Sequence, residues 1–122
     1  MAANVLVVED DRLNRNLICK VLRNEGYVVV EASDGAHALD LLDAQCFDLV
    51  ITDFVAPKLN GLKFVERLHM LQRRIPIIFI TGHLSVISSK AILDDVAEVL
   101  PKPFELDVLR STVQRLLEST SH

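Results

Sequence analysis

Acidic, hydroxyl and amine side chains follow successive apolar runs along this 122-residue chain. A carboxylate can accept a phosphoryl group or bind a metal ion, and a hydroxyl and an ammonium group can receive phosphoryl oxygens. If the runs are parallel strands, these groups meet at one edge of a sheet and could transfer a phosphoryl group onto Asp53. The residues follow the runs in this order: Glu9, Asp10 and Asp11, then Asp53, then Thr81, then Lys102.

Each of these residues also has an ordinary structural explanation. An acid after a strand can stabilise the next helix N-terminus by roughly 0.3 to 1 kcal/mol, and an isolated strand-end aspartate such as Asp53 is more often a cap or turn residue. Thr81 could be a plain β-branched strand residue. Lys102 could be a solvated lysine, although it lies between Pro101 and Pro103. The case for chemistry therefore depends on their meeting at one edge.

Clustered carboxylates need compensation. Two unit negative charges about 4 Å apart repel by about 1 kcal/mol in water and by about 4 kcal/mol at an effective dielectric constant of 20. Lys102 can offset part of the charge of Glu9, Asp10 and Asp53. Carboxylates, a carbonyl and waters are the ligands that Mg²⁺ prefers, so we expect Mg²⁺ to supply the rest.

The apolar runs indicate strands that are covered on both faces. They are continuous and rich in β-branched residues, which is typical of a parallel sheet. Predicted strands cover residues 5–8, 27–30, 48–53, 75–81 and 96–100. The second contributes Glu31, to which the sequence assigns no chemical role. Pro76 stands near the start of the fourth, where a missing donor is tolerated.

Helical periodicity separates these strands. Leu13, Leu17, Ile18, Val21 and Leu22 recur at helical spacing, and Gly26 follows where a C-terminal cap belongs. Ser33-Asp34-Gly35 opens a helix with Ala38, Leu41 and Leu42 on its inner face. Further helices are predicted over 62–71, 84–94 and 106–117. Alternation of strands and helices predicts an α/β fold, a five-stranded parallel, doubly wound sheet with helices on both faces and ligands bound at the carboxyl edge.

Composition excludes several classes of protein. Half of the residues are apolar and the net charge is −4, with no basic run, so we expect no direct binding of nucleic acid. Neither a signal peptide nor a membrane span is evident, which predicts a cytoplasmic protein. Cys19 and Cys46 are too few for a disulfide framework and are expected to be reduced thiols. We expect a single domain over residues 1–122, with a folded core of about 4–118.

Taken together, the motifs resemble those of the receiver domains of two-component response regulators. The resemblance extends from Val5 to about Leu117, and the ordered set of motifs is more specific than any one of them. It implies the flavodoxin-like strand order 2-1-3-4-5. The matching segments are Leu6 to Asp11, Ile51-Thr52-Asp53 with Pro57 and Asn60-Gly61, Ile80-Thr81-Gly82-His83, and Lys102-Pro103-Phe104.

The resemblance implies a role for each site residue. Asp53 resembles the phosphoacceptor, Asp10 the direct metal ligand, and Glu9 a second acid that acts mainly through water. Val55 would bind Mg²⁺ through its backbone carbonyl. Thr81 and Lys102 resemble the hydroxyl and the amine that contact the phosphoryl group, and the Lys102–Pro103 bond is cis in similar proteins. Asp11 has no counterpart among these roles and is read as a helix-capping residue with a minor share in the acid cluster.

The chain also departs from the family pattern. Val99 stands three residues before Lys102, where the family often has an aromatic switch residue, so the route of the signal is open. Val55 and His83 take positions that border the attacking water in similar domains. His83 is read as a loop residue flanking the site, and His37 and His69 as surface residues.

By the resemblance, the chain is a signalling domain that catalyses only its own phosphorylation and dephosphorylation. A histidine kinase or histidine phosphotransfer protein would supply the phosphoryl group, and a downstream protein would be the target. A phosphorylation-dependent homodimer is an alternative form of output. A haloacid-dehalogenase-type phosphatase is a rival, but it needs a second aspartate where Val55 stands. A flavin-binding module of the same topology is another rival, but its phosphate loop needs hydroxyls and glycines after the first strand, where Glu9, Asp10 and Asp11 would repel the phosphate. Excision from a longer protein also stays open.

Overall fold

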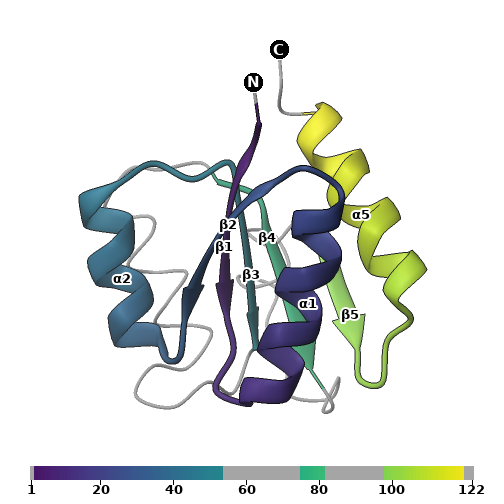
Figure 1. Ribbon diagram of the computed structural model, residues 1–122, viewed down its shortest axis with the longest axis horizontal. Coiled ribbons are helices and arrows are strands. Elements are labelled where there is room, and N and C mark those ends of the chain that lie inside the picture. Colours follow the sequence, from purple (N-terminus) through teal and green to yellow (C-terminus); the bar gives the residue numbers. More distant parts are fainter. Residues whose placement is uncertain (1, 54–74, 82–97, 120–122) are drawn as a thin grey trace.

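The computed structural model describes residues 2–53, 75–81 and 98–119. In this part of the chain, five parallel strands form one sheet in the order β2-β1-β3-β4-β5, so the predicted fold class and strand order are confirmed. All strands run toward the same edge (Figure 1). The strands are β1 (Asn4–Val8), β2 (Val28–Ala32), β3 (Leu49–Asp53), β4 (Ile77–Thr81) and β5 (Glu98–Pro101).

Helices cover both faces of the sheet. Helix α2 (Gly35–Ala44) packs on one face, and α1 (Arg12–Asn24) and α5 (Leu106–Ser119) lie side by side on the other (Figure 1). Alternate residues of each central strand supply the two cores, because successive side chains of a strand point to opposite faces. In β1, Leu6 and Val8 pack toward α2, whereas Val5 and Val7 pack toward α1 and α5. Burial on both faces explains why the strands read as continuous apolar runs.

Local signals fix the ends of α1 and the start of α2. Asp11 is the N-cap of α1, and its Oδ1 accepts a hydrogen bond from Leu13 N at 3.1 Å, so its predicted capping role is confirmed. Asp34 caps α2 in the same way, with Oδ1 2.8 Å from His37 N. These caps place the turn after β1 and the turn after β2 at the carboxyl edge.

Gly26 ends α1 in the left-handed conformation, with φ +93°. Gly26 N donates to Arg23 O and Tyr27 N donates to Leu22 O, which is the double hydrogen bond of a Schellman cap. The predicted glycine cap is thus confirmed. A Cβ at this position would meet nothing within 4 Å, so only backbone conformation disfavours a side chain here.

Gly26→Ala is expected to lower the free energy of unfolding by about 1 kcal/mol, the cost of placing an L-residue in the left-handed region. Gly26→Asn should lower the free energy of unfolding by less, because asparagine tolerates the left-handed region. Urea denaturation of both variants, with Asn24→Ala as an exposed helical control, measures the difference. Equal stability of Gly26→Ala and the wild-type chain would contradict the conformational argument.

The observed bounds differ from the predicted ones at a few positions. The second strand runs from Val28 to Ala32 rather than over 27–30, so Glu31 lies inside it. Leu13 and Leu17 fit the helical period of α1, yet their side chains are 78% and 46% exposed, whereas Ile18 and Leu22 are buried. The predicted loop 54–60 and helices 62–71 and 84–94 lie outside the described residues.

Candidate phosphoacceptor site

The backbone brings the ends of β1, β3, β4 and β5 together at the carboxyl edge. In the sheet, Val8 of β1 lies opposite Thr52 of β3. Asp53 of β3 lies opposite Ile80 of β4, and Thr81 of β4 lies opposite Pro101 of β5. Glu9 therefore follows a strand end that is paired beside Asp53, and Lys102 follows one paired beside Thr81. The predicted sharing of one edge by these residues is confirmed for the backbone.

Glu9 is a buried acid at this edge, with a relative exposure of 2%. Its Oε2 lies 3.5 Å from Lys102 Nζ, and its Oε1 accepts a hydrogen bond from Asp11 N at 3.1 Å. Burial of a carboxylate is costly without such partners, so the ion pair and the amide account for its position. Asp10, the next residue, is exposed.

Thr81 and Lys102 are joined through the backbone. Thr81 is buried, and its carbonyl oxygen accepts a hydrogen bond from Lys102 N at 2.7 Å. The Lys102–Pro103 peptide bond is cis, as the resemblance implies. This link fixes the start of the lysine beside the end of β4, and the Lys102 side chain, 28% exposed, turns toward Glu9.

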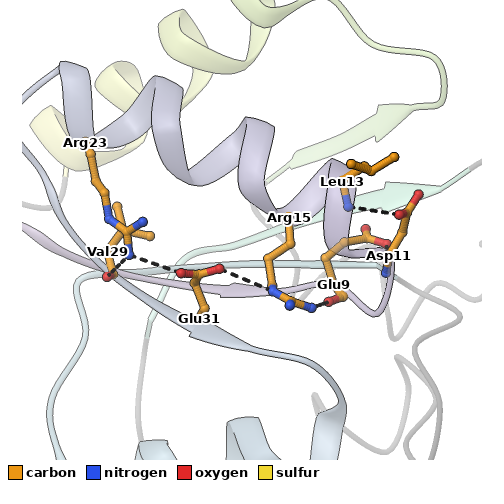
Figure 2. A network of polar contacts seen from close by, with 7 residues as sticks. All are labelled: Glu9, Asp11, Leu13, Arg15, Arg23, Val29 and Glu31. Atoms are coloured by element: carbon orange, nitrogen blue, oxygen red, sulfur yellow. Dashed lines mark hydrogen bonds and ion pairs between the residues drawn. The ribbon is translucent and has the colours of Figure 1, made fainter.

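A second polar cluster lies beside the acids, and sequence reasoning missed it. Arg15 and Arg23 of α1 both contact Glu31 of β2, with Arg15 Nε 3.3 Å from Oε1 and Arg23 Nη2 3.3 Å from Oε2 (Figure 2). Arg15 Nη1 also donates to the Glu9 carbonyl oxygen at 2.8 Å. Glu31 had no assigned role. The sequence carries no clear signal for this pairing, because it depends on how β2 pairs with β1 and on how α1 is rotated on the sheet.

Cys19 lies on α1 between the two arginines and is buried. Burial, and secondarily the negative charge of Glu31, raise the pKa of the Cys19 thiol from 9.0 to about 11. Between these two values the unfolded chain releases a proton that the folded chain retains, so this thiol makes folding less favourable as the pH rises from 9 to 11. Cys46 is exposed, and both cysteines are free.

At pH 8 a disulfide reagent is expected to titrate Cys46 quickly and Cys19 only after unfolding. The reason is that the thiolate is the reactive form and Cys19 is both buried and protonated at that pH. Absorbance of the released thiol, read in buffer and then in guanidinium chloride, measures this. Cys46→Ser should remove the fast phase. A fast phase that persists in Cys46→Ser would contradict the assignment.

The other predicted site residues are placed as follows. His37 is exposed on α2, as predicted, and Val99 is half-buried and packs on the α2 side of the sheet. Val55, His69 and His83 lie outside the described residues. Among the described side chains of residues 2–52, 75–81 and 98–118, which do not include that of Asp53, no three His, Cys, Asp or Glu residues are grouped to hold a metal ion. No helix in the same ranges is long and apolar enough to cross a membrane.

A doubly wound α/β domain with acids after β1, an aspartate closing β3 and a lysine after β5 is the arrangement found in signal receiver domains. The family model of the response regulator receiver domain matches residues 5–114. The chain belongs to the response regulator receiver domain family.

Individual relatives agree with this assignment. The chain is 38% identical over 122 residues to the response regulator MprA of Mycobacterium sp. (strain KMS), covering 99% of this chain and 53% of that protein. It therefore spans about half the length of the curated relatives it matches. Among solved structures, chemotaxis response regulator CheY4 of Vibrio cholerae is 30% identical with a TM-score of 0.86, covering 95% of this chain and 99% of that one. The Francisella response regulator 1452 receiver domain is 26% identical with a TM-score of 0.86, covering 98% and 99%.

Proposed function

We propose that Asp53 accepts a phosphoryl group in a Mg²⁺-dependent reaction, and that the phosphorylated domain engages a downstream protein. The observation that carries this proposal is the paired ends of β1, β3, β4 and β5, which gather Glu9, Asp53, Thr81 and Lys102 at one edge. The donor is a phosphohistidine of a histidine kinase or of a histidine phosphotransfer protein, as family membership implies.

In the proposed reaction, an Asp53 carboxylate oxygen attacks phosphorus, and the bond from phosphorus to the donor imidazole nitrogen breaks. The imidazole leaves with the bonding electrons and is protonated from solvent, while Asp53 becomes an acyl phosphate. The Lys102 ammonium group and the Thr81 hydroxyl receive phosphoryl oxygens. Positioning and charge neutralisation provide most of the catalysis in such transfers. In the reverse half of the cycle, water attacks phosphorus, the bond from phosphorus to the Asp53 oxygen breaks, and inorganic phosphate and the free carboxylate are formed. The proposed chemistry is limited to the domain's own phosphorylation and dephosphorylation.

The donor set at this edge fits Mg²⁺. Glu9 and Asp10 follow β1 and Asp53 closes β3, so hard oxygen ligands come from adjacent strands. With the Val55 backbone carbonyl, these residues would hold the ion, Glu9 mainly through water. When bound, Mg²⁺ would act as a Lewis acid that offsets the negative charge of the Asp53 carboxylate and of the incoming phosphoryl group.

Incubation with acetyl phosphate tests the proposal. Intact mass should increase by one phosphoryl group with Mg²⁺ and not with EDTA, and hydroxylamine should remove the group because it cleaves acyl phosphates. No labelling, or labelling that does not need Mg²⁺, would overturn the proposal. Continuous turnover of phosphate esters would instead identify a phosphatase.

Beryllium fluoride with Mg²⁺ offers a stable mimic of the phosphorylated state. Elution volume with and without the mimic then reports whether phosphorylation drives homodimer formation. A shift toward the dimer volume would support a dimeric output, and an unchanged volume would leave the downstream protein as the direct partner of one domain.

A further inference from the structure

We propose that Arg15 is a positioning residue that fixes Asp10, the exposed acid after β1, by binding the peptide group in front of it. The expected effect on Mg²⁺ affinity rests on the proposed function. The positioning of Asp10 itself is argued from the hydrogen bonds around Glu9 and Asp11 (Figure 2).

Both peptide groups that flank Asp10 are held. The preceding one includes the Glu9 carbonyl, which accepts from Arg15 Nη1 at 2.8 Å. The following one includes Asp11 N, which donates to Glu9 Oε1 at 3.1 Å. One residue earlier, Glu9 N donates to Ala32 O at 3.1 Å and continues the sheet. The backbone of Asp10 is thus restrained on both sides, and its exposed side chain starts from a fixed point.

Arg15 is itself restrained. Its guanidinium group uses Nε toward Glu31 Oε1 and Nη1 toward the Glu9 carbonyl, so one rigid fork spans β2 and the turn after β1. Glu31 is held from the other side by Arg23, which also donates to Val29 O at 3.0 Å. The Arg15 side chain is only 17% exposed, whereas that of Arg23 is 49% exposed. Of the two arginines, Arg15 is the one that contacts the turn after β1, through the Glu9 carbonyl oxygen.

Groups that orient metal ligands from behind typically change metal affinity by 10- to 100-fold when removed. A fixed Asp10 need not be ordered when Mg²⁺ binds, so the ion is bound with a smaller loss of backbone entropy. Without Arg15, the Glu9 carbonyl loses its charged donor, and the segment before Asp10 must be ordered by the metal itself.

Arg23→Gln is a matched control for Arg15→Gln. Both substitutions remove an arginine of α1 that pairs with Glu31, but only Arg15 contacts the Glu9 carbonyl. We expect Arg15→Gln to weaken Mg²⁺ binding, measured by calorimetry, by roughly 10-fold. Arg23→Gln should stay within about twofold of wild type. In acetyl phosphate labelling, Arg15→Gln should need more Mg²⁺ for half-maximal rate while keeping most of the rate at saturating Mg²⁺.

Amide hydrogen exchange tests the positioning without any metal. Arg15→Gln should speed exchange at Asp11 N, while the amides of β3 and α5 should keep their wild-type protection. Arg15→Lys keeps the charge but lacks the fork, and should recover only part of the Mg²⁺ affinity. Equal effects of Arg15→Gln and Arg23→Gln, unchanged exchange at Asp11, or complete recovery by Arg15→Lys would each overturn the proposal. If the wild-type chain neither binds Mg²⁺ nor is labelled, the proposed function fails, and amide exchange still decides whether Arg15 positions Asp10.

Discussion

Asp53→Asn is expected to abolish the Mg²⁺-dependent mass increase with acetyl phosphate. The amide oxygen of asparagine is a far weaker nucleophile than a carboxylate and carries no charge to bind the metal. Intact-mass analysis after incubation at saturating Mg²⁺ measures the loss directly. Asp43→Asn makes the same chemical change on the exposed surface of α2 and should be labelled like wild type.

The same substitution should stabilise the metal-free protein. Two unit negative charges about 4 Å apart repel by about 1 kcal/mol in water and by more in a low-dielectric site, and asparagine removes one of the charges at this edge. In EDTA, the urea midpoint of Asp53→Asn should therefore rise by the equivalent of about 1 kcal/mol, and that of Asp43→Asn should stay close to wild type. Persistent labelling of Asp53→Asn, or its destabilisation in EDTA, would contradict the assignment of Asp53.

The sequence predicted the sheet well because burial on both faces leaves a strong pattern. Continuous apolar runs that alternate with helical segments indicate a covered parallel sheet, and β1, β3 and β4 lie close to their predicted places. In α1, the helical spacing of apolar residues did not predict correctly which side chains are buried. Leu13 and Leu17 share the helical spacing of Ile18 and Leu22, but the sheet and α5 cover only part of the face that the pattern spans.

The site was predictable as far as it depends on topology. Strand ends of a parallel sheet share one edge, so the neighbourhood of Glu9 and Lys102 follows from their positions after β1 and β5. The role of Glu31 did not follow, because the predicted strand ended before it. Pairing of Glu31 with Arg15 depends on the register of β2 beside β1 and on the rotation of α1, which are properties of the packed structure.

The ion pair of Glu9 and Lys102 allows a second prediction with a large expected effect. Lys102→Met keeps an unbranched stem but removes the cation from a buried carboxylate, so we expect a loss of about 1 to 3 kcal/mol in the free energy of unfolding. Glu9→Gln keeps a side-chain oxygen that can accept from Asp11 N and should cost less. In a double-mutant cycle, the two substitutions together should be less harmful than the sum of their separate effects.

Mg²⁺ separates the role of Lys102 at the site from its role in stability. Without the lysine, the acids after β1 and at the end of β3 retain more uncompensated charge, so the bound ion should raise the urea midpoint of Lys102→Met more than that of wild type. Labelling by acetyl phosphate should nevertheless fall, because a phosphoryl oxygen loses its cationic partner. Lys20→Met, on the exposed side of α1, is the control and should match wild type in both measurements. Additive energies in the cycle, together with an unchanged response to Mg²⁺, would show that Lys102 does not compensate the charge of these acids.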